Sequence, residues 1–132
     1  MAARILIIED DDPSRELVKY LLSANGYEAI EAPDGGAGVR LALEHNPDLI
    51  ICDLQMPVLN GYEVVQTLLQ HAAWRRVPLV AVTALSMSGD RERTLAAGFD
   101  DHITKPIVPE TFVQQIEVHL PPGLLASRPA DG

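Results

Sequence analysis

Residues 49–53, Leu49-Ile50-Ile51-Cys52-Asp53, place four apolar side chains in a row and end in a carboxylate. An unbroken apolar run of this length is typical of a strand that is buried on both faces of a parallel sheet. Two further runs have the same character, namely Ile5-Leu6-Ile7-Ile8 and Leu79-Val80-Ala81-Val82. The chain is therefore expected to build its core around several buried parallel strands.

Amphipathic segments lie between these runs. Apolar residues recur in two of them at a spacing that gives a helix one apolar stripe, first at Leu17, Val18, Leu21 and Leu22 and then at Val64, Val65, Leu68 and Leu69. The first helix is predicted from about Pro13 to Asn25. Asp12 is its predicted N-cap, and Gly26 follows its predicted end.

The alternation of strands and helices predicts the fold class. Five strands are expected near residues 4–9, 27–31, 48–53, 78–82 and 101–104, each followed by a helix, the last of them near 109–119. Right-handed crossovers then give a doubly wound α/β domain with a five-stranded parallel sheet, most simply in the order 2-1-3-4-5. The domain is predicted over residues 1–120, and residues 121–132, rich in Pro, Gly and Ala, are predicted to form a flexible tail.

Composition narrows the classes of function. A chain of 132 residues has room for one domain. The 19 acidic against 10 basic residues give a net charge of −9, which argues against electrostatic binding to nucleic acid or to an anionic membrane. The single cysteine, Cys52, fits a reducing compartment, and no apolar run approaches the ~20 residues of a membrane span. We therefore expect a soluble, cytoplasmic protein without a signal peptide.

Carboxylates gather at the ends of two predicted strands. The first strand ends in Glu9-Asp10 and the third ends in Asp53, and the predicted strand order makes these strands neighbours at the switch point where ligands bind. Carboxylates so close repel one another unless a cation neutralises them, and an all-oxygen site suits Mg²⁺. The sequence therefore predicts a magnesium site. Asp11 and Asp12 are interpreted as a solvated loop and a helix cap.

Two more residues are predicted to reach the same edge of the sheet. Thr83 ends the fourth strand and Lys105 follows the fifth. A carboxylate that attacks a phosphoryl donor needs Mg²⁺, a fixed cation and a hydroxyl group to hold the oxygens of the transferring group. Either residue alone has an ordinary structural interpretation, but their joint placement opposite Asp53 favours a phosphoryl-acceptor site. The added charge of about −1.5 to −2 would then draw in Thr83 and the loop behind it.

Several dispersed motifs resemble the receiver domain of bacterial response regulators, a CheY-like, flavodoxin-like fold, from about residue 4 to residue 120. These are Ile8-Glu9-Asp10-Asp11, Cys52-Asp53-Leu54-Gln55-Met56-Pro57 with Gly61, Val82-Thr83-Ala84, and Ile103-Thr104-Lys105-Pro106. The resemblance implies two-component phosphorelay signalling, in which Asp53 takes a phosphoryl group from a histidine kinase or a histidine phosphotransfer protein.

The resemblance also implies a role for each site residue. Asp10, Asp53 and the backbone carbonyl of Gln55 would bind Mg²⁺, and Glu9 would support the metal through water. Lys105 would pair with the phosphate, and a cis peptide would join it to Pro106. Gln55 also resembles the position that tunes the lifetime of the acyl phosphate.

Other features bear on subtype and output. Residues 86–92, Ser86-Met87-Ser88-Gly89-Asp90-Arg91-Glu92, resemble receivers of hybrid kinases and stand-alone regulators of the DivK type. Only about a dozen residues follow Leu120. We therefore expect output through another protein, bound by the fourth helix, the fifth strand and the fifth helix, from a monomer or a phosphorylation-dependent dimer.

His102 departs from the family pattern, because receivers usually carry Tyr or Phe three residues before the lysine. An imidazole that makes the same inward rotation and a plain surface histidine both remain open.

Two other classes of function compete with this interpretation. A hydrolase of the haloacid dehalogenase type also uses an Asp nucleophile with Mg²⁺, but that family has a second Asp two positions on, where this chain has Gln55. A receiver that binds partners without being phosphorylated is the other, and the intact set of Glu9, Asp10, Asp53, Thr83 and Lys105 argues against it.

Overall fold

The computed structural model describes residues 2–84 and 89–126. Five parallel strands form one sheet in the order β2-β1-β3-β4-β5, as predicted. The strands are β1 (Arg4–Ile8), β2 (Glu28–Ala32), β3 (Leu49–Cys52), β4 (Leu79–Thr83) and β5 (Asp101–Thr104). The helices are α1 (Asp12–Ala24), α2 (Gly35–His45), α3 (Gly61–Gln70), α4 (Asp90–Ala96) and α5 (Pro109–Glu117), followed by a short 3-10 helix, η1 (Pro122–Leu124).

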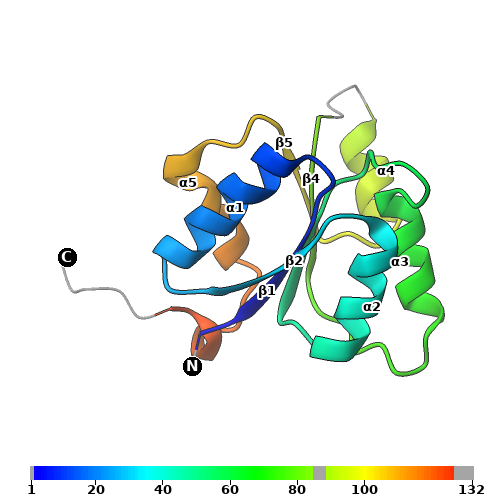
Figure 1. Cartoon of the computed structure of the whole chain (residues 1–132), viewed down its shortest axis with the longest axis horizontal. Coiled ribbons are helices and arrows are strands. Elements are labelled where there is room, and N and C mark those ends of the chain that lie inside the picture. The colour runs from blue at the N-terminus through cyan, green and yellow to red at the C-terminus, as the bar shows by residue number, and fades with distance from the viewer. Residues whose placement is uncertain (1, 85–88, 127–132) are drawn as a thin grey trace.

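Helices cover both faces of the sheet. Figure 1 shows α1 and α5 on one face and α2, α3 and α4 on the other. Side chains of β1 alternate between the two layers, so that Ile5 and Ile7 pack with the first pair of helices and Leu6 and Ile8 pack on the opposite face. Because both faces of the sheet are covered, the central strands β1, β3 and β4 carry apolar runs, which is the pattern seen in the sequence.

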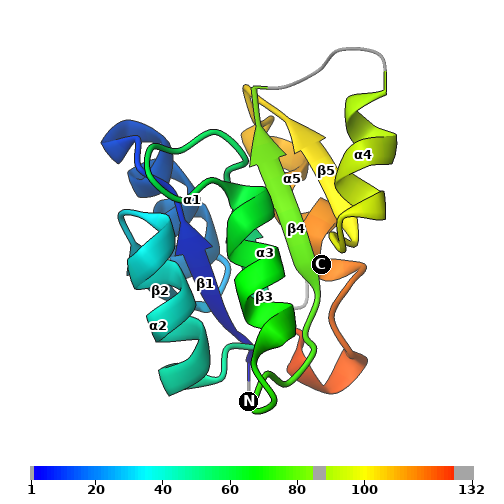
Figure 2. The ribbon, with the colours of Figure 1, turned by 90° about the vertical axis from the view of Figure 1, so that its right-hand side faces the viewer.

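The parallel direction of the strands collects their carboxyl ends at one edge. Figure 2 shows β1, β4 and β5 pointing the same way, away from the N-terminus. At this edge β1 pairs with β3, and the register sets Ile8 opposite Cys52. The residues that follow these two positions therefore leave the sheet side by side.

The start of α1 differs from the prediction by one residue. Asp11, in extended backbone, is the N-cap, and its carboxylate accepts a hydrogen bond from the Ser14 amide at 3.0 Å. Asp12 is instead the first helical residue, so its predicted capping role is wrong. The end of the helix agrees with the prediction, because Asn25 is the C-cap and Gly26 follows with a positive φ of 90°.

Part of the predicted flexible tail is held against the domain. The amide of Ala3 donates to the carbonyl of Leu124 at 3.0 Å, and the amide of Ala126 donates to the Tyr27 hydroxyl at 3.1 Å. Leu124 and Ala126 pack against the apolar layer beneath α1 and α5. The folded unit therefore extends beyond the predicted boundary at residue 120, while residues 127–132 lie outside the described part of the chain.

Two further expectations concern membrane-spanning helices and the stretch that indicates the receiver subtype. Among the described residues, no helix has both the length and the apolar character needed to cross a bilayer. The subtype stretch 86–92 is only partly described, because residues 86–88 lie outside the described ranges.

Candidate functional site

Glu9 and Asp53 leave β1 and β3 next to each other. The amide of Asp53 donates to the carbonyl of Ile8 at 3.0 Å, which extends the strand pairing by one residue. Both carboxylates are buried, whereas Asp10 is exposed at the rim. Carboxylate oxygens of Glu9, Asp10 and Asp53 all lie within 4.8 Å of one another. The structure thus brings together the three carboxylates that the sequence placed on two separate strands.

Lys105 closes this acidic cluster from the side of β5. Its Nζ atom lies 2.8 Å from Glu9 Oε1 and 3.1 Å from Asp53 Oδ2. The Lys105 amide donates to the carbonyl of Thr83 at 2.8 Å, so the ends of β4 and β5 hold these two residues together. Thr83 is fully buried as the last residue of β4. The peptide between Lys105 and Pro106 is cis, as predicted.

Burial and charge set the protonation behaviour of the cluster. Burial raises the pKa of the Glu9 carboxyl to about 7, the hydrogen bond from Lys105 opposes this shift, and the charge of Asp53 adds to it. Burial alone would lower the pKa of Lys105, but the carboxylates of Glu9 and Asp53 raise it above its ordinary value. Lys105 is therefore a fixed cation between two buried acids.

The loop after β3 holds Asp53 from the opposite side. The amide of Gln55 donates to Asp53 Oδ1 at 3.0 Å, so the lysine and this amide engage different oxygens of the carboxylate. Gly61 begins α3 directly against this loop, and a Cβ atom there would lie 2.5 Å from the carbonyl oxygen of Asp53. The Gly61 amide also donates to the Leu54 carbonyl at 3.1 Å. The first residue of α3 must therefore be a glycine for this packing.

The donor atoms of the cluster suit a hard divalent cation. Carboxylate oxygens are the ligands that Mg²⁺ prefers, and an exposed rim leaves room for the waters that this ion retains. Glu9, Asp10 and Asp53 fit such an ion by residue type and by the spacing of their oxygens. The role of the Gln55 carbonyl as a further ligand stays a prediction.

A cavity of about 410 Å³ opens beside the cluster. Glu9, Asp53 and Lys105 line one end of it, and α1 and the segment after β5 supply apolar walls, including Leu17, Val18, Pro106 and Ile107. The cluster thus borders a largely apolar cavity.

The family of response regulator receiver domains matches residues 5–117. The chain belongs to this family.

Its relatives include stand-alone regulators. The polar-differentiation response regulator DivK of Brucella ovis is 38% identical over 120 residues, which cover 91% of this receiver and 98% of that protein. The DivK protein of Brucella anthropi matches to the same extent. This membership assigns the receiver to two-component phosphorelay signalling, and it favours that interpretation over the hydrolase hypothesis.

Solved structures share the fold. The chemotaxis protein CheY4 of Vibrio cholerae has a TM-score of 0.84 at 28% identity, covering 91% of this receiver and all (100%) of that chain. The receiver domain of the sensor histidine kinase PA1611 from Pseudomonas aeruginosa has a TM-score of 0.81 at 31% identity, covering 90% and 98%. That structure was solved with a magnesium ion coordinated in its active-site cleft.

His102 lies on β5 and is buried in this receiver, so the interpretation as a surface histidine is wrong. It pairs with Ala81 on β4, and Thr83 pairs with Thr104. Because side chains two residues apart share a face, His102 and Thr83 project from the same face of the sheet. His102 therefore lies outside the acidic cluster but shares a face of the sheet with Thr83.

Sequence reasoning missed two polar networks, one beside the site and one at the start of β5. Arg15 donates from α1 to the carbonyl of Glu9 at 2.8 Å. Asp101 on β5 contacts both Arg91 of α4, at 3.2 Å, and His119 after α5, at 2.9 Å. The only sequence signal for Arg15 is its position three residues after Asp12, which is the spacing of a helical ion pair.

Proposed function

We propose that this receiver is a single-domain switch in which Asp53 accepts a phosphoryl group in a Mg²⁺-dependent reaction. The donor is a histidine kinase or a histidine phosphotransfer protein, and residues 1–120 carry the reaction. One observation supports this above all others: Lys105 Nζ bridges Glu9 and Asp53, with Asp10 at the rim. The receiver family and the magnesium ion in the PA1611 receiver support it independently.

The chemistry is an in-line transfer to a carboxylate oxygen of Asp53. The bond between oxygen and phosphorus forms as the bond from the donor's imidazole nitrogen to phosphorus breaks, and that nitrogen keeps the electron pair. Asp10, Asp53 and the Gln55 carbonyl would hold Mg²⁺, with Glu9 supporting it through water. When bound, the ion neutralises negative charge on the transferring group.

Lys105 and Thr83 recognise the product. The ammonium of Lys105 pairs with one phosphate oxygen, and the Thr83 hydroxyl donates to another. Movement of Thr83 toward the phosphate frees space on the face of the sheet that it shares with His102. We propose that His102 turns into this space and so alters the surface of α4, β5 and α5, where a downstream protein binds.

The protein acts by holding its phosphoryl group rather than by turning over a substrate. Gln55 occupies the position where a haloacid dehalogenase has its second Asp, so the general acid of that mechanism is replaced by an amide. The proposed output is a change in protein binding in the cytoplasm, by a monomer or a phosphorylation-dependent dimer. Neither nucleic acid nor membrane is a proposed partner.

Mass spectrometry tests this function. The protein is incubated with Mg²⁺ and acetyl phosphate, and the intact mass should increase by one phosphoryl group. Asp53→Asn should abolish the adduct, and so should a chelator of divalent cations. Continuous release of phosphate without an adduct would support the hydrolase, and neither adduct nor turnover would support a passive binding module.

A further inference from the structure

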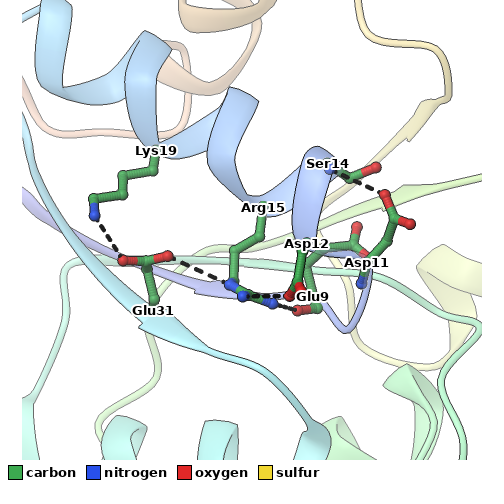
Figure 3. A network of polar contacts seen from close by, with 7 residues as sticks. All are labelled: Glu9, Asp11, Asp12, Ser14, Arg15, Lys19 and Glu31. Atoms are coloured by element: carbon green, nitrogen blue, oxygen red, sulfur yellow. Dashed lines mark hydrogen bonds and ion pairs between the residues drawn. The ribbon is translucent and has the colours of Figure 1, made fainter.

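Arg15 is a cation next to the site that contacts three different acceptors. It lies in the first turn of α1, and its side chain is only 14% exposed. Nη1 donates to the carbonyl of Glu9 at 2.8 Å, Nη2 to Asp12 Oδ1 at 2.6 Å and Nε to Glu31 Oε1 at 3.3 Å. Figure 3 shows the guanidinium between these three acceptors.

The outer side of this network is braced as well. Glu31 on β2 accepts from Arg15 through Oε1 and pairs through Oε2 with Lys19 Nζ at 2.9 Å, one turn further along α1 (Figure 3). A guanidinium presents its donors in a fixed plane, so three acceptors on three segments determine its orientation. The network therefore ties the end of β1 to α1 and β2 at fixed geometry.

The contact with the Glu9 carbonyl acts on the acidic loop itself. The Glu9 amide is bound to the carbonyl of Ala32 at 3.0 Å, which leaves its own carbonyl as the first main-chain acceptor beyond the β1–β2 pairing. A peptide group is planar, so a donor that fixes this carbonyl also fixes the amide and the Cα atom of Asp10. Asp10 is the exposed member of the cluster.

We propose that Arg15 is a positioning residue for Mg²⁺ binding, acting through the Glu9–Asp10 peptide. This inference rests on the proposed function, in which Asp10 is a metal ligand. Because Arg15 already holds the Glu9–Asp10 peptide, Asp10 loses less conformational entropy when the ion binds. The positive charge of Arg15 also offsets part of the repulsion among the carboxylates of Glu9-Asp10-Asp11-Asp12. Its binding partners distinguish it from an exposed surface ion pair, which stabilises little, because one of them is the main chain of the site.

Conservative substitution separates geometry from charge. Arg15→Lys keeps the positive charge but replaces the planar fork with a single ammonium that cannot serve all three acceptors. The dissociation constant for Mg²⁺, measured by calorimetry, should rise by about tenfold or more, as for other residues that orient metal ligands. Arg40→Lys is the matched control, because Arg40 is 60% exposed and pairs only loosely with Glu44 at 3.7 Å on α2. Its affinity for Mg²⁺ should equal that of the wild type.

Kinetics and exchange supply readouts that a purely structural role would not change. In acetyl phosphate labelling, Arg15→Lys should raise the Mg²⁺ concentration for half-maximal rate, while the rate at saturating Mg²⁺ stays near that of the wild type. In the metal-free protein, the Asp10 and Asp11 amides should exchange hydrogen faster. Glu31→Gln, which removes the charge of the outer anchor and leaves Arg15 in place, should weaken Mg²⁺ binding in the same direction.

The outcomes distinguish this inference from the function on which it rests. Wild-type affinity for Mg²⁺ in both Arg15→Lys and Glu31→Gln would overturn the positioning role, and thermal unfolding shows whether each variant is folded. If the wild type bound Mg²⁺ without Asp53-dependent labelling, the proposed function would fail while the affinity comparison still decided the role of Arg15. A wild type that did not bind Mg²⁺ would overturn both.

Discussion

At the scale of single residues, Gly61 leaves no room for a side chain beside Asp53, the proposed phosphoryl acceptor. Gly61→Ala would place a Cβ atom 2.5 Å from the carbonyl oxygen of Asp53 and 2.8 Å from the Cα atom of Leu54, so the acceptor loop must shift. We expect a loss of about 1–3 kcal/mol in the free energy of unfolding, as for other overpacked positions, together with slower phosphorylation of Asp53. Urea unfolding and intact-mass labelling measure the two effects.

Gly36 provides the matched comparison. It also lies in the first turn of a helix, α2, but a Cβ atom there would come no closer than 3.5 Å to Asp34 Oδ1. Gly36→Ala should therefore be neutral or slightly stabilising, because glycine costs a helix about 0.5–1 kcal/mol relative to alanine. Equal stability of the two variants would contradict the contact described for Gly61.

At this same scale, the sequence predicted the acidic site well and its supports poorly. Glu9 and Asp53 could be placed because each directly follows an apolar run, and Lys105 because it follows the predicted fifth strand. The strand order then brings these ends together. Asp11 and Asp12 carry the same chemical group, so only the local backbone decides which of them caps α1. Glu31 binds Arg15 across 16 positions of sequence, a pairing that no local pattern reports.

Among the elements, β5 joins two helices through Asp101. Burial raises the pKa of this carboxyl, but hydrogen bonds from His119, the His102 amide and Arg91 together outweigh burial and hold the pKa below its ordinary value. A carboxyl with a lowered pKa in the folded state stabilises the protein above its ordinary pKa, and this stabilisation is lost as the pH falls through the folded value. The contribution should therefore be present above the ordinary pKa of an aspartate and decline as the pH falls below it.

Asp101→Asn tests this connection between α4, β5 and α5. The variant lacks the titrating group, so its free energy of unfolding should fall less than that of the wild type over the same acid range. Urea unfolding at several pH values measures the difference. Combining Asp101→Asn with His119→Gln should cost less than the sum of the single changes, since the two side chains are in contact at 2.9 Å. Parallel acid profiles and strict additivity would contradict the connection.

Across the whole molecule, the C-terminal segment closes the layer beneath α1 and α5. Leu124→Ala removes apolar contacts with that layer, so we expect a loss of about 1–2 kcal/mol in the free energy of unfolding. Val118→Ala should have little effect, because Val118 is 76% exposed at the end of α5. Denaturant unfolding compares the two, and equal losses would contradict the packing of residues 122–126.

The sequence predicted the strand order of the whole molecule but not this closure. Strand order follows from apolar runs and chain handedness, which are visible along the sequence. Pro121, Pro122 and Gly123 suggested a free end, yet they also shape the turn that returns Leu124 to the domain. Composition indicates how flexible a segment is on its own, but it does not indicate whether the segment packs against the rest of the domain.

The charges on β2 have a consequence for association. β2 is an edge of the sheet, and open edges are templates on which a strand of another chain can add. Glu28 and Glu31 stand on this edge and are paired with Arg4 and with Arg15 and Lys19. A strand of another chain that added to β2 would have to displace these ion pairs and bury their carboxylates. The same contacts that brace the acidic loop thus protect the receiver from edge-to-edge aggregation.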